Sequence, residues 1–329
     1  MNKIRIIVTG GSGFIGTNVV DDFIKFNYDF INVDISKPKN PEHNIFWKDI
    51  SLTDKQSLKK IFKDFKPTHV LHLASILGGE GITSEKLNEN IISMKNIIEV
   101  INDCSSVQSF LFASSLLVCA NGYIPKNDTD YCPPNEYGKS KVECEKIMRS
   151  SVINCRWNIV RPTAIWGPWF QESSKSFFRV IDRGLYFHLG NHNAKKSACY
   201  VGNASYMMRK ILFSEERINK QTFYLADYPS YSIREWANCI QENLNLKPII
   251  QIPLIILRCA AILGDLIEKI TTFKFPLTSF RLNNMLVEVE YPVQNTLELC
   301  GDLPFNLNNS VKQTIQWLNE HKMIKNKLI

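Results

Sequence analysis

The stretch Ile4-Arg5-Ile6-Ile7-Val8-Thr9-Gly10-Gly11-Ser12-Gly13-Phe14-Ile15-Gly16 decides the fold of this chain of 329 residues. Residues 4–8 form an apolar, β-branched run that is typical of a strand buried in a parallel sheet. A glycine-rich turn follows, and a helix is expected to begin near Phe14. A strand, a glycine turn and a helix in this order predict the first half of a dinucleotide-binding βαβ unit.

The glycines of this stretch indicate where a pyrophosphate would bind. Three of them recur at every third position, and Gly11 with the last two also fits G-x-G-x-x-G. Small residues allow a tight turn and a close approach of the backbone to phosphate oxygens, and the following helix directs its N-terminal amides at the same point. We expect the cofactor to contact Gly10, Gly13, Phe14, Ile15 and Gly16.

The second predicted strand, residues 30–34, ends in Asp34, which lies 18 residues after Gly16. An acidic residue near this spacing is placed to accept hydrogen bonds from an adenosine ribose. Because its charge would repel a 2′-phosphate, the sequence favours NAD over NADP. Lys37 and Lys39 weaken that preference, so NADP stays open as an alternative.

Strand-like and helix-like segments alternate through residues 1–165. The strand candidates are 4–9, 30–34, 69–73, 107–114 and 155–161, and the helix candidates are 14–26, 54–65, 84–103 and 136–151. This alternation predicts an α/β Rossmann domain, a parallel sheet wound on both faces, with ligands beyond the carboxyl ends of the strands.

The pattern changes after residue 165, and a smaller mixed α/β lobe is expected over residues 166–329. Its helix candidates are 173–183, 203–214, 232–243, 253–270 and 307–320. The boundary is blurred, because the strand-like run at 222–226 leaves open a return of the chain to the sheet.

Composition excludes several other classes of protein. The net charge of +7 comes from lysines spread along the chain, without the basic, aromatic-flanked run of a nucleic-acid site. Nine cysteines without a C-x-x-C spacing predict reduced thiols, a cytoplasmic protein and no metal site. The first strand begins within a few residues of the N-terminus, which predicts no signal peptide.

One segment, residues 249–270, invites a membrane interpretation. It is rich in isoleucine and leucine, but charged residues interrupt it and its apolar runs are too short to span a bilayer. A packed helix is the primary prediction, no transmembrane segment is expected, and peripheral membrane contact is the alternative.

Tyr137 and Lys141 point to hydride chemistry on an alcohol or ketone. They lie four residues apart on the predicted helix 136–151 and therefore share one face. A phenol is a weak base at neutral pH unless a nearby ammonium stabilises the phenolate. Ser115, at the end of the predicted strand 107–114, could hydrogen-bond the reacting oxygen, or could act only as a strand-end cap.

Taken in order, these motifs resemble those of the extended short-chain dehydrogenase/reductases, in the NAD-dependent nucleotide-sugar epimerase/dehydratase group. The resemblance implies bound NAD(P), a C-terminal lobe that grips a nucleoside diphosphate sugar, and Ser115, Tyr137 and Lys141 as the catalytic triad. It also implies contacts of Asp49 and Ile50 with the adenine and of Leu73 and Ala74 with the nicotinamide side. Members often dimerise through helices equivalent to 84–103 and 136–151, so a homodimer is expected.

Departures from the family pattern narrow the activity. Dehydratases of this group carry an acidic pair directly after the catalytic hydroxyl, where this chain has Leu116 and Leu117. Cys119 follows soon after and is interpreted as a buried structural thiol, with proton transfer as the alternative. The diphosphate-binding candidates are Lys196 and Arg281, and less directly Lys195 and Arg234.

The expected function is oxidoreduction at a sugar carbon, C4 by resemblance, of a nucleoside diphosphate sugar. A 4-epimerase is the leading hypothesis. A 4-keto-sugar-nucleotide reductase or dehydrogenase is the second, since it needs the same triad. A non-catalytic nucleotide-sensing protein on the same fold is the third.

Overall fold

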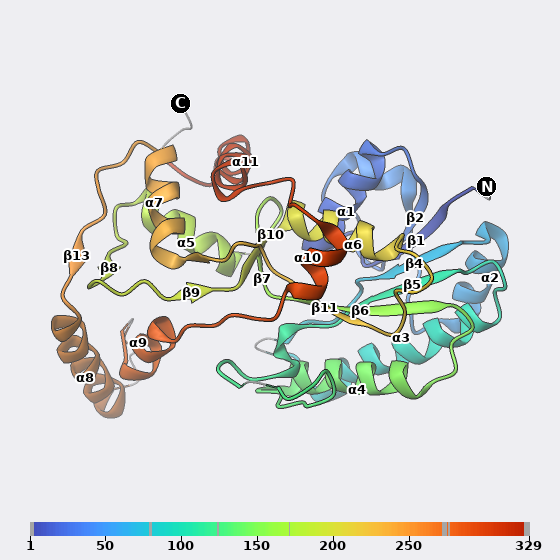
Figure 1. Cartoon of the computed structure of the whole chain (residues 1–329), viewed down its shortest axis with the longest axis horizontal. Coiled ribbons are helices and arrows are strands. Elements are labelled where there is room, and N and C mark those ends of the chain that lie inside the picture. Colours follow the sequence, from blue (N-terminus) through green and yellow to red (C-terminus); the bar gives the residue numbers. More distant parts are fainter. Residues whose placement is uncertain are drawn as a thin grey trace. The chain divides into compact units, whose positions relative to one another are not determined.

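A computed structural model describes residues 3–78, 81–123, 125–170, 172–271, 275 and 277–325, with the backbone alone for 172–176 (Figure 1). The chain forms two compact units. Unit 1 contains residues 1–170, 199–228 and 291–305, and unit 2 contains residues 171–198, 229–290 and 306–329. Two segments beyond the expected boundary at residue 165 therefore belong to unit 1.

The centre of unit 1 is a parallel sheet of seven strands in the order β11-β6-β5-β4-β1-β2-β3. The strands are β1 (Arg5–Thr9), β2 (Asp29–Val33), β3 (Trp47–Lys48), β4 (His69–His72), β5 (Ser109–Ala113), β6 (Arg156–Pro162) and β11 (Thr222–Leu225). The predicted Rossmann fold is confirmed. The sequence missed β3, because two residues between a 3-10 turn and a loop carry no periodicity.

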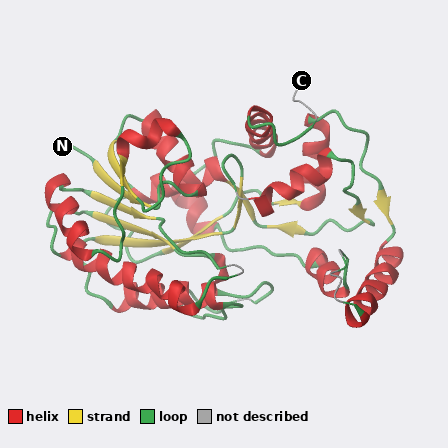
Figure 2. Cartoon of the chain, turned by 180° about the vertical axis from the view of Figure 1, so that it is seen from behind, coloured by secondary structure: helices red, strands yellow, loops and turns green. Residues whose placement is uncertain are grey.

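Helices cover both faces of this sheet (Figures 1 and 2). One face carries α1 (Phe14–Lys25) and α6 (Val201–Leu212). The other carries α2 (Lys55–Phe65), α3 (Ser84–Asn102) and α4 (Glu136–Ser150). Side chains of Asp54, Thr83 and Asn135 cap the N-termini of the last three helices, which explains where these helices begin.

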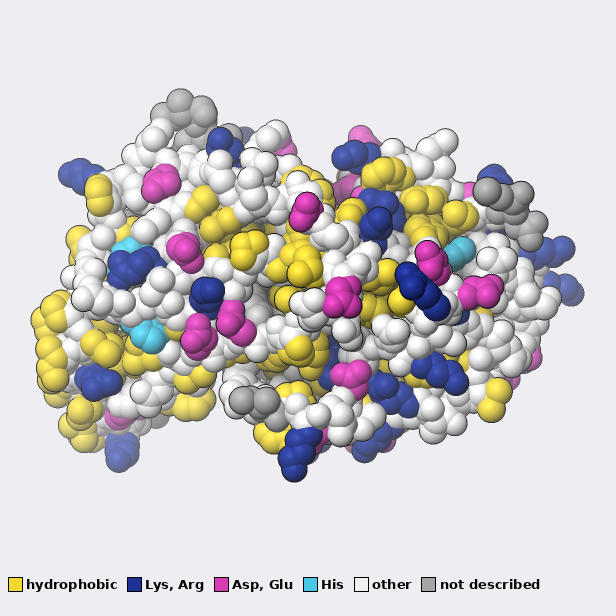
Figure 3. Space-filling view, viewed as in Figure 1, with side chains coloured by type: hydrophobic (Ala, Val, Ile, Leu, Met, Phe, Trp, Pro, Cys, Tyr) yellow, Lys and Arg dark blue, Asp and Glu magenta, His cyan; other side chains and the backbone are white. Residues whose placement is uncertain are grey.

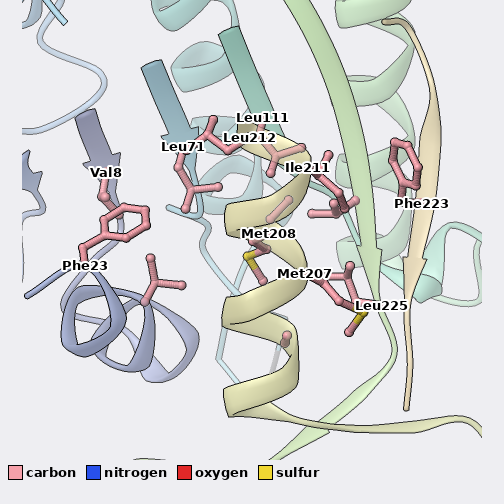
Figure 4. Packing of buried hydrophobic residues seen from close by; sticks show 14 of the residues in the cluster. Val8, Phe23, Leu71, Leu111, Met207, Met208, Ile211, Leu212, Phe223 and Leu225 are labelled. Carbon is pink, nitrogen blue, oxygen red and sulfur yellow. The ribbon is translucent and has the colours of Figure 1, made fainter. Parts of the chain in front are cut away.

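Successive side chains along a strand point to opposite faces of the sheet, and each face has its own hydrophobic core. Ile6 and Val8 of β1 pack on the α1 and α6 side, whereas Ile7 packs on the opposite side. Figure 4 shows Met207, Met208 and other side chains of α6 directed at the strands. Both faces of each central strand are thus apolar, as expected of a sheet buried by two helical layers.

Unit 1 is completed by segments from late in the chain. Strand β11 pairs with β6 in parallel register, Thr222 opposite Ile159, and α10 (Gln294–Cys300) packs against the α1 and α6 side. Thr296 donates a hydrogen bond of 2.8 Å to the carbonyl oxygen of Tyr224, which fixes α10 on β11.

Unit 2 contains helices joined by short strand pairs. Its helices are α5 (Glu172–Asp182), α7 (Ile233–Asn243), α8 (Leu254–Ile270), α9 (Ser279–Leu286) and α11 (Leu307–Glu320). Strand β8 (His188–Leu189) pairs with β13 (Gln251–Ile252), and β9 (Lys195–Lys196) pairs with β12 (Tyr231–Ser232). Leu189, Leu257, Ala261 and Leu282 form a small core between β8, α8 and α9.

A fully buried ion pair joins α4 to β6. The guanidinium of Arg161 donates to both carboxylate oxygens of Glu145, at 3.0 and 2.8 Å, and also to the Tyr224 hydroxyl and the Asp128 carbonyl. Burial alone would raise the pKa of Glu145, but the hydrogen bonds and charge of Arg161 outweigh it and hold that pKa below its usual range.

Substituting Glu145→Gln should lower the free energy of unfolding by about 3–5 kcal/mol, because it leaves the buried Arg161 charge without its carboxylate. Glu143→Gln, on the exposed side of the same helix, should change that free energy by less than about 0.5 kcal/mol. Urea denaturation measures both. Since a lowered pKa in the folded state makes stability fall as Glu145 is protonated, the wild type should lose stability below about pH 4.5 more steeply than E145Q. Equal midpoints for E145Q and E143Q would contradict the structural role of the pair.

Candidate active site

The glycine turn between β1 and α1 is packed so tightly that a Cβ on either of two of its glycines would overlap backbone atoms. Gly10 has a φ of +76°, and a Cβ there would lie 2.4 Å from the backbone nitrogen of Ala74. A Cβ on Gly16 would lie 2.1 Å from the carbonyl oxygen of Gly10. The first glycine therefore lets the turn approach the end of β4, and the last lets α1 pack on the turn.

Gly13 differs from these two glycines. A Cβ there would meet only the Gly10 carbonyl oxygen, at 3.3 Å. Gly13 is also the N-cap of α1, and it caps the helix without a side-chain hydrogen bond. The turn thus presents backbone and helix N-terminus without an intervening side chain, which fits the pyrophosphate of NAD.

Asp34 follows β2 and lies against the glycine turn. Its carboxylate accepts hydrogen bonds from the backbone amides of Ser12, at 3.0 Å, and Ser36, at 2.8 Å. Burial raises the pKa of Asp34 and these hydrogen bonds oppose the rise. Two carboxylate oxygens have more acceptor capacity than two amides use, so the group can also accept from a ribose hydroxyl.

Four further cofactor candidates follow β3 and β4. Asp49 comes directly after β3 and is close enough for its charge to act on Asp34, whereas Ile50 packs against the core. Leu73 donates a backbone hydrogen bond of 2.9 Å to Thr9, at the end of β1, and Ala74 abuts Gly10. All four lie at the carboxyl edge of the sheet, and Ala74 lies directly against the glycine turn.

Helix α4 carries Tyr137 and Lys141. The Lys141 side chain is buried, and its ammonium donates to the carbonyl oxygen of Ala113, the last residue of β5, at 2.9 Å. The same nitrogen lies 5.9 Å from the centroid of the Tyr137 ring and 4.9 Å from that of Phe112. The structure therefore places a fixed, buried ammonium beside a half-buried phenol.

Ser115 begins the 3-10 turn η2 (Leu116–Val118), and its hydroxyl oxygen accepts from the Leu117 amide at 3.1 Å. The hydroxyl is therefore a cap, as the sequence allowed, yet its own proton stays available for donation. The start of α4 presses on this turn, since a Cβ on Gly138 would lie 2.2 Å from the Leu117 carbonyl oxygen. This contact brings the Ser115 turn next to Tyr137.

Three residues that the sequence patterns did not single out hold the site together. Asn32 accepts from the Gly11 amide, at 2.9 Å, and donates to Ser12. Asn90 of α3 exchanges two hydrogen bonds with the backbone of Ile76 and donates to Ser140, so it ties the segment after β4 to α4. Gly138 allows the contact described above. Asn32 and Asn90 each interrupt an apolar pattern, which was the available signal.

His72 lies beneath the site as a neutral ring. Burial, assisted by the charge of Lys141, lowers its pKa to about 3. Its Nδ1 is 2.6 Å from the Thr9 hydroxyl, and its ring stacks on Phe112 at 5.6 Å between centroids. His72 therefore joins the ends of β1, β4 and β5 without adding a charge.

The diphosphate candidates Lys196 and Arg281 lie in unit 2, around α9. The Lys196 ammonium donates to the carbonyl oxygens of Asn284, at 3.1 Å, and Val287. Arg281 donates to the carbonyl oxygen of Phe275. Both cations thus have backbone partners in the structure, and their role toward a diphosphate stays a prediction.

Cys119 is buried behind η2, where its thiol donates to the carbonyl oxygen of Asp130 at 3.3 Å. Burial raises the pKa of this thiol, which suits a structural residue better than a proton donor working at neutral pH.

Comparison with known proteins gives a family and a fold. The model of the NAD dependent epimerase/dehydratase family matches residues 6–224. An N-acetyl-α-D-glucosaminyl-diphospho-ditrans,octacis-undecaprenol 4-epimerase of Escherichia coli O157:H7 is 24% identical over 95% of both chains, and a UDP-glucose 4-epimerase of Vibrio cholerae is 23% identical over 94% of both. The solved UDP-glucose 4-epimerase of Thermotoga maritima superposes with a TM-score of 0.71 at 18% identity, covering 97% of this chain and 100% of that one.

The glycine turn makes a testable contrast. Gly13→Ala should weaken NAD binding by about tenfold, about 1.4 kcal/mol, because its methyl group enters the space left for phosphate, while stability stays close to that of the wild type. Gly16→Ala should instead lower the free energy of unfolding by about 1–3 kcal/mol, because its methyl group overlaps the Gly10 carbonyl. Calorimetric NAD titration and urea denaturation measure the two effects. Unchanged NAD affinity in a folded G13A protein would refute this assignment of the phosphate site.

Proposed function

The chain belongs to the NAD-dependent epimerase/dehydratase family, and from this premise we propose that it is a 4-epimerase of a diphosphate-linked sugar, with a nucleoside diphosphate sugar as the substrate. The observation that carries the proposal is the arrangement around Lys141. Its buried ammonium is held by the Ala113 carbonyl next to the Tyr137 ring, and the Ser115 turn packs on the same helix. When bound, NAD supplies a reversible acceptor for hydride.

In this proposal the chain's own residues handle the proton. Tyr137 takes the proton of the sugar hydroxyl as the carbon is oxidised and returns it when the ketone is reduced. Lys141 stabilises the phenolate and, from its fixed position, donates to the nicotinamide ribose. Ser115 uses its hydroxyl proton, which the cap to Leu117 leaves available, to hold the reacting oxygen.

The turn after Ser115 argues against a dehydratase. Removal of water from a sugar needs an acid and a base near the carbon that loses its hydroxyl. Leu116 and Leu117 occupy η2 directly after the serine, and neither can transfer a proton. The same turn suits an epimerase, which removes and returns a hydride and the hydroxyl proton at one carbon and expels no water.

Both curated relatives named above are 4-epimerases, and in both the sugar is carried on a diphosphate. They differ in the carrier, which is uridine in one and a polyprenol in the other. These names support the reaction and the diphosphate more strongly than the carrier.

A 4-keto-sugar-nucleotide reductase is the second candidate, since it would use the same three side chains. The cofactor present on purification separates the two. An epimerase should retain NAD through purification and interconvert epimers with none added, whereas a reductase should consume one NAD(P)H for each ketone reduced.

A non-catalytic nucleotide sensor is the third candidate. Ser115, Tyr137 and Lys141 together speak against it, because binding a nucleotide alone would not require a hydroxyl and a phenol beside the buried ammonium.

Tyr137→Phe should lower kcat for epimerisation by about 10²–10⁴-fold, because it removes the proton-transfer group and leaves the ring in place. Tyr123→Phe is the matched control: it also removes one phenol, from an exposed residue bonded to Asp130, and should keep normal turnover. A coupled assay that separates the two epimers measures both. Normal turnover by Y137F would exclude Tyr137 as the catalytic group.

The substrate is best sought by thermal shift. UDP-, GDP-, CDP- and dTDP-sugars, each with NAD or NADP, should be screened, and a ligand at about 100 times its Kd should stabilise the protein by about 2.7 kcal/mol. We expect the largest shift with NAD and one nucleotide sugar. No shift with any nucleotide sugar would count against this carrier.

The expected homodimer through α3 and α4 stays a prediction, which sedimentation equilibrium would test.

A further inference from the structure

Helix α8 has an apolar stripe on the side that unit 2 does not cover. Its inner side packs Leu257, Ala261 and Gly264 against the remainder of this small core. Six isoleucine and leucine side chains elsewhere on the helix have exposed fractions between 48% and 82%: Ile255, Ile256, Ile262, Leu263, Leu266 and Ile270. Figure 3 shows hydrophobic side chains gathered over the place that α8 occupies in Figure 1.

These side chains form one continuous stripe. At 3.6 residues per turn they span an arc of about 120°, centred opposite the buried side, with no charged residue inside it. Exposed Cys259 falls in the middle of this arc. Ile250 and Phe280, which flank α8 along the chain, are exposed as well, at 65% and 74%.

Charges on α8 are sorted around the stripe. Arg258 and Lys269 fall along one edge of it, at helical positions next to Ile262. The two acidic residues lie farther from the stripe around the helix, and both accept backbone hydrogen bonds within unit 2. Asp265 accepts from the Ser279 amide at 3.1 Å, and Glu268 accepts from the Phe275 amide at 2.9 Å. This edge of the stripe is therefore cationic, which complements an anionic surface.

The size of the stripe decides between possible occupants. A helix of 17 residues is about 25 Å long and about 10 Å wide, so the stripe offers about 250 Å². A stable protein–protein interface buries about 800 Å² on each partner, several times more. No helix among the described residues is long and apolar enough to cross a membrane. An apolar stripe with a cationic border is the form of a helix that lies in the interface of a bilayer.

We propose that α8 docks this protein on the surface of an anionic phospholipid bilayer, with the stripe in the acyl boundary and Arg258 and Lys269 among the headgroups. The occupant is the bilayer itself. The inference does not depend on the sugar carrier and would hold for an enzyme acting on either kind of diphosphate-linked substrate.

Flotation of the full-length protein with vesicles tests the proposal. Vesicles of phosphatidylcholine alone are compared with vesicles in which about one lipid in three is phosphatidylglycerol. The wild type should float with the anionic vesicles, and the double variant L263E/L266E should lose about tenfold or more of the bound fraction. The matched control is I45E/L185E, which adds the same charge at two apolar residues outside α8 that are more exposed than Leu263 and Leu266.

Two further experiments test the cationic residues of α8 and the contact between this helix and the bilayer. Arg258→Gln with Lys269→Gln should reduce binding to the anionic vesicles while leaving thermal stability unchanged. An environment-sensitive fluorophore on Cys259, whose side chain is exposed, should shift its emission to the blue when vesicles are added.

Equal flotation of wild type and L263E/L266E, with both folded by circular dichroism, would overturn the proposal. So would a wild type that stays with the lipid-free fraction while sedimentation equilibrium shows that L263E/L266E breaks a dimer, because the stripe would then be an interface between two copies.

Discussion

The close approach of the glycine turn to the end of β4 is the contact on which the site depends. With Gly10 against the Ala74 backbone and Gly16 against the Gly10 carbonyl, the turn, α1 and the segment after β4 have only one arrangement. That segment then runs to Tyr137, since a Cβ on Gly78 would lie 2.9 Å from the Tyr137 Cβ. One short path of backbone thus links the phosphate end of the site to its reacting end, with Asn90 holding the middle through Ile76.

Two residues on the same side of helix α4 contact two different strands of the sheet. Lys141 reaches the end of β5, and Glu145, one turn later, reaches Arg161 on β6. A buried ion pair is a poor source of net stability, because desolvation offsets most of the attraction. The ion pair instead fixes the position of α4. Glu145 can bond to Arg161 in only one placement of this helix, and that placement determines how far Lys141 and Tyr137 lie from the sheet. The carbonyl of Asp128 joins the same guanidinium, so the loop behind the Ser115 turn is fixed as well.

Patterns that repeat along the chain were sufficient to predict the sheet and its main helices. The predicted helix 84–103 is α3 (Ser84–Asn102), and 307–320 matches α11 (Leu307–Glu320), because periodicity and capping residues act locally. The sequence placed Tyr137 and Lys141 on one face for the same reason. It could not show that Asn90 and Gly138 serve the site, since their partners, Ile76 and Leu117, are brought near only by the folded sheet. It also gave no reason to place Lys196 and Arg281 around a single helix, α9, because a helix of eight residues is too short for its periodicity to stand out.

Helix α8 shows where hydrophobic content alone is ambiguous. A run such as Ile249–Ile270 predicts burial, and the packed helix expected from it exists, but a helix that is apolar on two sides needs two apolar neighbours. Unit 2 provides one, the core around Leu189 and Leu282. All four charged residues of α8 lie outside the stripe: Asp265 and Glu268 accept backbone hydrogen bonds within unit 2, and Arg258 and Lys269 border one edge of the exposed side. A chain under no constraint on that exposed side would accept polar residues there at little cost to folding. Six large aliphatic side chains in one uninterrupted arc are therefore better explained by a second apolar phase than by the stability of unit 2.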